Sequence, residues 1–159
     1  MLNFSLPIGF LTLISLWPNP NLLARAETCI PLPVLGGQGS EVTKSVSQPT
    51  IPSPLGIDIT RNNWNTDWAV PTDRRFDRFV ATITAPGGGS FDIKMYLKYN
   101  DGTTGEFFNT AGARLQPGQP LVIKAENRPG DEPYQVNLFI GGVNYFGNTY
   151  TASVVGCYR

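Results

Sequence analysis

The chain has 159 residues, with twelve Lys and Arg, twelve Asp and Glu and no histidine, so its formal net charge is zero. Recognition of phosphate backbones and anionic lipids needs a surplus of Lys and Arg, so neither a nucleic acid nor an anionic membrane is expected as a partner. The absence of histidine excludes imidazole-based catalytic relays and His-ligated zinc sites. The length suits one domain.

Residues 1–26 are predicted to be a signal peptide. The apolar core between Leu6 and Trp17 is about a dozen residues long, within the ~7–15 of a signal-peptide core and short of the ~18 of a membrane span. Ala24-Arg25-Ala26 then supplies the small-x-small pattern that signal peptidase reads. We therefore expect cleavage before Glu27, a mature chain without a membrane span, and a secreted location, either periplasmic or extracellular. Because no Lys or Arg precedes the apolar core, an uncleaved membrane anchor is the alternative.

The only two cysteines, Cys29 and Cys157, lie near the two ends of the expected mature chain. In an oxidising compartment two cysteines of a small domain usually pair, so a Cys29–Cys157 disulfide is predicted. Because the closed loop would be long, the loop-entropy model assigns this bond roughly 4–5 kcal/mol. Intermolecular pairing is the alternative. A lipid anchor on Cys29 is rejected, because Glu27 and Thr28 are not the small residues that this modification requires.

Residues 27–55 are rich in Pro, Gly and Ser and poor in aromatic side chains. Such a composition buries too little apolar surface to offset the chain entropy, so an extended or mobile linker is predicted here. Thr50–Pro54 is a candidate for a sheet edge, where proline is tolerated.

From residue 56 to residue 159 the pattern changes to short strands separated by turns. Ser90–Tyr99 shows the clearest alternation of apolar and polar side chains, which is typical of a half-buried strand. Asn100-Asp101-Gly102 then predicts a hairpin turn into a return arm at Gly105–Phe108. Further strands are predicted at Phe79–Ala85, Leu121–Ala125, Tyr134–Ile140 and Thr149–Tyr158. About seven or eight strands without any helical stripe predict an all-β fold, a single antiparallel β-sandwich that is Ig-like or jelly-roll-like.

The candidate ligand site lies between Asn62 and Trp68. In an extended chain the two tryptophans share one face, and amide and carboxylate side chains are interleaved with them. Aromatic planes stack on the C–H faces of sugars while Asn and Asp bind the hydroxyls, so this composition suits a carbohydrate. The candidate residues are Trp64, Trp68, Asn63, Asn65 and Asp67, and Tyr96 is a further candidate. The structural alternative is that tryptophan fills the core of a sandwich, and we favour core packing for at least one of the pair.

Two charged features have structural interpretations. Asp73–Arg78 is read as a solvated loop whose arginines pair with its own aspartates, in preference to a grip on an acidic partner. The turns at Asn100–Thr103 and Asp131–Glu132 lack the alternating ligand run of a calcium loop, so no metal site is predicted.

The sequence thus predicts an exported, non-catalytic β-domain without a cofactor, which binds a ligand or partner at the cell envelope or outside it. Carbohydrate is the leading ligand class. One alternative is a structural or adhesive envelope protein that acts through Thr50–Pro54 or the Phe107-Phe108 pair. The other is a carboxylate-dependent glycosidase, although no catalytic residue is assigned. Its candidate acids would be Asp58, Asp67, Asp73, Asp77, Glu106 and Glu126.

Overall fold

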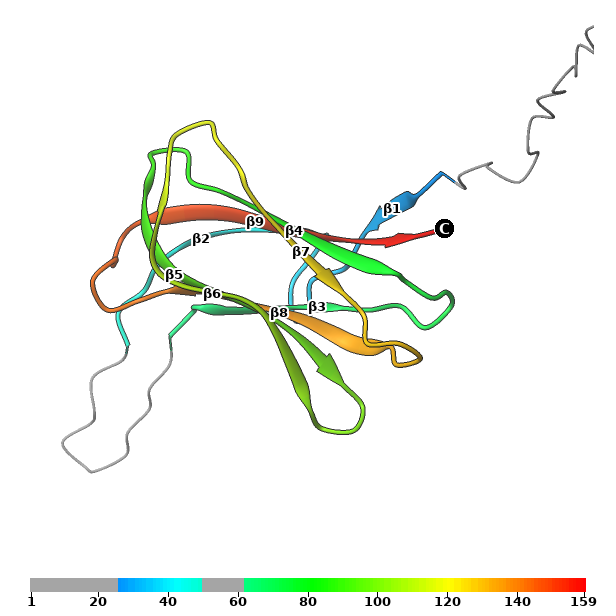
Figure 1. Cartoon of the computed structure of the whole chain (residues 1–159). Coiled ribbons are helices and arrows are strands. Elements are labelled where there is room, and N and C mark those ends of the chain that lie inside the picture. The colour runs from blue at the N-terminus through cyan, green and yellow to red at the C-terminus, as the bar shows by residue number, and fades with distance from the viewer. Residues whose placement is uncertain (1–25, 50–61) are drawn as a thin grey trace, which may run out of the picture.

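The computed structural model describes residues 26–49 and 62–159. Within these ranges the chain forms nine strands in two packed antiparallel sheets and no helix, which confirms the predicted all-β sandwich (Figure 1). No helix in the described ranges is therefore long and apolar enough to cross a membrane. The predicted signal-peptide core, the candidate edge Thr50–Pro54 and Asp58 lie outside the described residues.

Sheet A contains five strands. Its order begins with β1 (Thr28–Pro31), which pairs with β9 (Thr149–Tyr158), and continues through β4 (Arg78–Thr84) to β7 (Leu121–Glu126). The fifth strand, β2 (Glu41–Ser45), also pairs with β9, beyond the stretch that β1 occupies. Sheet B has the order β3 (Asn65–Ala69), β8 (Pro133–Gly141), β5 (Gly89–Tyr99) and β6 (Thr104–Leu115).

The strands predicted from alternation are all present, and β5 shows why. Its apolar positions from Phe91 to Tyr99 are at most 1% exposed and point between the sheets, while the polar positions between them face outward. The hairpin to β6 turns at Gly102, whose φ of 79° favours glycine, as Asn-Asp-Gly predicted. β6 runs on to Leu115, well beyond the predicted return arm, with register shifts in its pairing to β5.

The described part of the predicted linker, residues 27–49, differs from expectation because it belongs to the sandwich. β1 and β2 extend sheet A, and Leu32 and Val46 are 0% and 3% exposed in the core. Between these strands the chain reaches sheet B, where the carbonyl of Pro33 accepts a hydrogen bond from the N–H of Ala69 at 2.9 Å. Two apolar anchors and backbone pairing thus hold a segment whose composition alone is typical of a linker.

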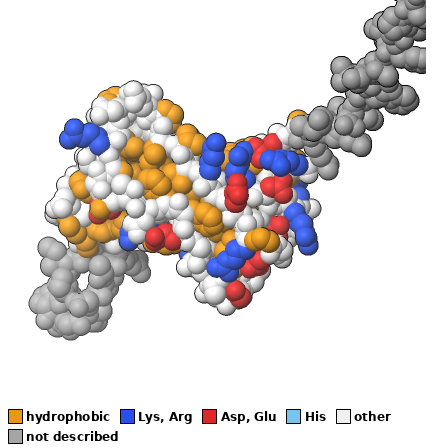
Figure 2. Space-filling view, in the orientation of Figure 1, with side chains coloured by type: hydrophobic (Ala, Val, Ile, Leu, Met, Phe, Trp, Pro, Cys, Tyr) orange, Lys and Arg blue, Asp and Glu red, His pale blue; other side chains and the backbone are white. Residues whose placement is uncertain are grey.

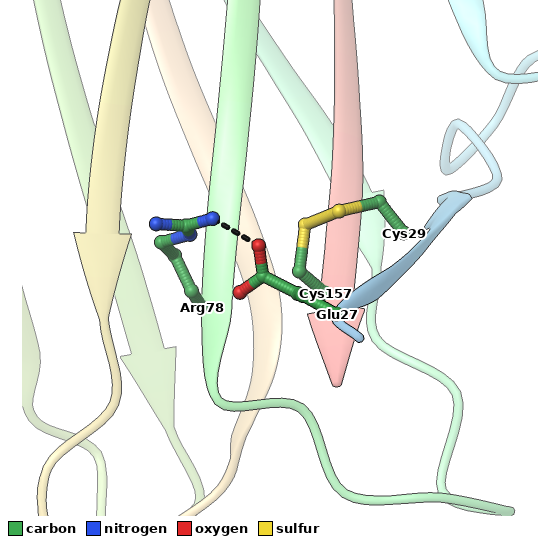
Figure 3. The surroundings of a disulfide bond; sticks show 4 residues. All are labelled: Glu27, Cys29, Arg78 and Cys157. Atoms are coloured by element: carbon green, nitrogen blue, oxygen red, sulfur yellow. Dashed lines mark hydrogen bonds and ion pairs between the residues drawn. A yellow bond between two sulfur atoms is a disulfide. The ribbon is translucent and has the colours of Figure 1, made fainter. Parts of the chain in front are cut away.

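The predicted disulfide between Cys29 and Cys157 is present and joins residues 128 apart in sequence. The two cysteines lie directly opposite each other on β1 and β9. Beside them the carboxylate of Glu27 pairs with the guanidinium of Arg78 on β4 (Figure 3). The start of β1 is therefore fixed to sheet A by a covalent bond and an ion pair.

Candidate ligand-binding face

Both tryptophans of the candidate site are buried, but their rings lie in different places. The Trp64 ring packs against the outward positions Phe139 and Gly141 of β8, whereas Trp68 lies on the inward side of β3. Trp68 is 0% exposed and its indole N–H donates to the carbonyl of Ser40 at 3.0 Å. Trp64 is 8% exposed and donates to the carbonyl of Ser47 at 2.8 Å. Core packing of at least one indole is confirmed. The prediction that Trp68 contacts the ligand is wrong, because its entire side chain is covered by protein.

The candidate polar residues Asn63, Asn65 and Asp67 take two different positions. Asn65 and Asp67 alternate with the buried side chains of β3 and therefore point away from the core, with Asn65 exposed and Asp67 half-buried. Asn63 instead ties β3 to the end of β2, because its side-chain amide donates to the carbonyl of Ser45 at 2.8 Å. Its side-chain oxygen accepts from the N–H of Ser47 at 3.0 Å. Asn65 and Asp67 remain available at the surface.

The outward side chains of β3, β8, β5 and β6 form a regular grid, which we call the outer face of sheet B. Strand register aligns them in three rows that each cross the sheet. In order across the strands, these rows are Ala69, Gln135, Lys98 and Thr104; Asp67, Asn137, Tyr96 and Glu106; and Asn65, Phe139, Lys94 and Asn109. Two aromatic rings thus lie on adjacent strands among amide, carboxylate and ammonium groups.

A hydrogen-bond network holds the polar groups of the middle row in place. The side-chain amide of Asn137, which is only 6% exposed, donates to Asp67 Oδ1 at 2.7 Å. The ammonium of Lys98 reaches the same oxygen at 3.1 Å. At the β6 edge, the side-chain amide of Asn109 donates to both carboxylate oxygens of Glu106 at 3.2 Å. These side chains are therefore oriented before any ligand arrives.

The two aromatic residues of the outer face of sheet B sit in different surroundings. Desolvation, and then the neighbouring carboxylate of Glu106, raise the pKa of the Tyr96 hydroxyl. Phe139 packs edge-on against Trp64 with ring centroids 5.7 Å apart, and the ammonium of Lys94 lies 5.7 Å from its ring centroid. The buried Trp64 thus supports a ring that is itself half-exposed.

The geometry of this face does not suit a pair of catalytic carboxylates. Asp67 and Glu106 belong to one row but stand on the two edge strands, so three strand spacings, about 14 Å, separate their backbones. Glycoside cleavage requires carboxyl groups roughly 5–9.5 Å apart. Asp73 is exposed and pairs with Arg74 at 2.7 Å. Asp77 and Glu126 lie elsewhere, in a surface hollow that also contains Arg78.

The remaining sequence candidates have structural positions. In the Asp73–Arg78 cluster, Phe76 is buried and Arg78 pairs with Glu27 outside the cluster, so only the Arg74–Asp73 pair is internal as predicted. Asp101 caps its hairpin turn, because its Oδ1 accepts from the N–H of Thr103 at 2.8 Å. Phe107 is 37% exposed at a register shift of β6, and Phe108 packs partly against the core.

The sequence analysis did not identify Asn137, Phe139 or Asn109 as candidates. It named Glu106 only as a candidate catalytic acid. A partial signal exists in Gln135 and Asn137, two amides that alternate with apolar residues in β8. Their alternation indicates a wet face. It does not indicate which strands lie beside β8. The grid depends on those neighbours, β3 and β5.

Comparisons with known proteins found similarity to solved structures alone. No family model matches the sequence, and no curated protein matches it. Among solved structures, the chain is similar to a xylan-binding module of family CBM15, with 10% identity, a TM-score of 0.47, and coverage of 83% of this chain and 96% of that one. A mutant of the family 29 carbohydrate-binding module CBM29-2 has 9% identity, a TM-score of 0.44, and coverage of 83% and 92%. The C-terminal family 22 carbohydrate-binding module of Clostridium thermocellum Xyn10B has 12% identity, a TM-score of 0.38, and coverage of 80% and 90%.

Proposed function

We propose that this protein is an exported, non-catalytic domain that binds carbohydrate on the outer face of sheet B. The observation that carries the proposal is the grid itself, in which Tyr96 and Phe139 lie diagonally on adjacent strands among fixed amides and charged groups. Aromatic rings offer apolar surface to the C–H faces of a sugar, while the surrounding donors and acceptors match its hydroxyls.

The composition of this face favours a hydroxyl-rich ligand over a protein partner. The central part of a protein interface is depleted of charged side chains and more apolar than the surrounding surface. Here the middle of the sheet carries Asn137, Lys98 and Lys94, and the aromatic rings are single and separated. A sugar chain replaces the water at such polar groups with its own hydroxyls, so few buried polar atoms are left unpaired.

Export is supported by two independent features. The Cys29–Cys157 disulfide is of the kind that persists in oxidising compartments. Residues 1–26 have the apolar core and cleavage pattern of a signal peptide. A mature chain that begins at Glu27 would keep the whole of β1.

The proposal is tested by binding of the mature domain to a glycan array and to insoluble polysaccharides, with Tyr96→Ala as the variant. The matched control is Tyr134→Ala, a tyrosine that is 43% exposed at the start of β8 and outside the grid. We expect Tyr96→Ala to lose at least roughly tenfold in affinity, about 1.4 kcal/mol, while Tyr134→Ala binds as the unmodified domain does. Failure of the unmodified domain to bind any glycan would overturn the proposal, as would equal binding by Tyr96→Ala.

A second pair of variants separates polar recognition from folding. Lys98→Ala removes the cationic partner of Asp67 and leaves its hydrogen bond from Asn137, whereas Lys124→Ala removes an exposed lysine on the outer side of β7 in sheet A. Both changes remove one surface ammonium, and far-ultraviolet spectra of both variants should match the unmodified domain. Only Lys98→Ala is expected to weaken glycan binding.

A further inference from the structure

Aromatic contacts continue past the end of sheet B into the loop of residues 142–147. The indole of Trp64 lies between Phe139 of β8 and Phe146 of this loop, with ring centroids 5.7 and 6.4 Å away. Trp64 itself is 8% exposed, whereas Phe146 is 38% exposed and Val143 is 62% exposed. The row of rings therefore extends from the outer face of sheet B to an exposed apolar loop.

Tyr145 of the same loop rests on two glycines beside the grid. A Cβ on Gly112 of β6 would lie 3.1 Å from the Tyr145 hydroxyl, and a Cβ on Gly142 would lie 2.8 Å from its ring. Both glycines have positive φ, at 64° and 119°, so they admit this close approach. Asp92 joins the same region, because its Oδ1 accepts from the N–H of Gly112 at 2.8 Å. The loop therefore lies beside Asp92, near the start of β5.

The surface formed by the grid and this loop is long in the strand direction. Lys98 and Asp92 mark its ends on β5, and the six residue steps from one to the other correspond to about 20 Å at ~3.4 Å per step. The loop of residues 142–147, which follows the end of β8, adds Phe146 beside Trp64. A single sugar unit would leave most of such a surface uncovered.

The charges on this surface do not favour a polyanion. Lys98 is paired with Asp67. Lys94, the other lysine of the grid, has no carboxylate within ion-pair distance among the described residues and lies over the Phe139 ring. Glu106 and Asp92 add negative charge at the β6 side and at the loop end. An acidic polysaccharide would face these carboxylates without a cationic track to offset the repulsion.

We infer that the ligand is an uncharged glycan chain of several sugar units, which lies along β5 and β8 and reaches Phe146 at its far end. This inference rests on the proposed function and adds the chain length, the charge class and a second aromatic subsite. Trp64 acts in it as a positioning residue, because it supports both Phe139 and Phe146 without being accessible itself.

The test is calorimetric titration of the mature domain with cello-, xylo- and manno-oligosaccharides, each from dimer to hexamer, and with hexamers of galacturonic and guluronic acid. We expect one neutral series to bind, its affinity to rise at least roughly tenfold from dimer to hexamer, and that affinity to be insensitive to added NaCl. Phe146→Ala should weaken hexamer binding and leave the shorter oligomers unaffected. The control is Val122→Ala, a 49% exposed apolar residue on β7 in sheet A.

The outcomes distinguish this inference from the function on which it rests. If no oligosaccharide binds, the carbohydrate function and the inference both fail. If a neutral dimer binds as tightly as its hexamer, if the uronic acid hexamers bind more tightly, or if Phe146→Ala behaves like Val122→Ala, only the inference fails. Melting temperatures of both variants equal to that of the unmodified domain exclude a loss of folding as the cause.

Discussion

Removal of the disulfide should destabilise the domain by an amount that depends on the length of the loop it closes. The bond closes a loop of 128 residues, and the loop-entropy relation gives about 5 kcal/mol for that length at 25 °C. The Cys29→Ala/Cys157→Ala variant leaves β1 with only four residues of pairing to β9 and the Glu27–Arg78 ion pair. A half-buried ion pair of this kind contributes roughly 1 kcal/mol or less, so it does not replace the covalent bond.

The assay is equilibrium unfolding in urea, followed by the fluorescence of the buried Trp64 and Trp68. We expect the free energy of unfolding to fall by several kcal/mol in the double variant and in the reduced unmodified protein alike. Glu27→Gln, which removes the ion pair and keeps the disulfide, should cost roughly 1 kcal/mol or less. A double variant within about 1 kcal/mol of the unmodified protein would refute the view that this bond restrains the two chain ends.

Three further stability predictions address the interior and the sandwich edge. In Gly141→Ala the new Cβ would lie 2.4 Å from the Trp64 ring, so we expect thermal unfolding to show a stability loss of about 1–3 kcal/mol. The control Gly87→Ala, whose Cβ would have no atom within 4 Å, should leave stability unchanged. Equal melting temperatures of the two variants would contradict the packing of Trp64 against Gly141. Burial raises the pKa of Tyr150 to about 12, so the folded state keeps this phenol neutral while the unfolded chain ionises near pH 10. Stability present below pH ~10 should therefore be lost as the pH rises toward ~12, by up to about 3 kcal/mol, and a Tyr150→Phe variant with the same pH dependence would rule this out. Lys44→Met should lower the free energy of unfolding, measured in urea, by about 1–3 kcal/mol, because the Lys44 ammonium donates to Asn63 O, Asn65 O and Thr66 Oγ1 at 3.2, 3.1 and 2.7 Å. A loss no larger than that of the exposed Lys124→Met would show that these three hydrogen bonds do not stabilise the fold.

The strands that the sequence predicted are those whose evidence is local. The alternation in Ser90–Tyr99 and the turn at Gly102 each need only neighbouring residues to be recognised, and both are found where expected. The disulfide needed only the count and positions of two cysteines. β1 and β2 were missed because their stability comes from pairing with β9, which is more than a hundred residues away in sequence.

The candidate site was only partly predictable for a similar reason. Alternation predicted one shared face for Trp64 and Trp68, but Trp64 precedes β3 and packs against Phe139. For Trp68, the choice between core and solvent depends on which side of β3 sheet A covers. The polar residues Asn65 and Asp67 between them were the available indication that the opposite parity is wet. Their neighbour Asn137 is supplied by a strand seventy residues later, and no local pattern reports that register.

The location of the ligand is tested most directly by backbone amide NMR of the mature domain, titrated with the oligosaccharide that binds most tightly in calorimetry. The account predicts chemical-shift changes that cluster at Asn65, Tyr96 and Asn137 and in residues 142–147, while the amides of β4 and β9 in sheet A stay unchanged. Saturable changes confined to sheet A, or to the hollow beside Asp77 and Arg78, would contradict it.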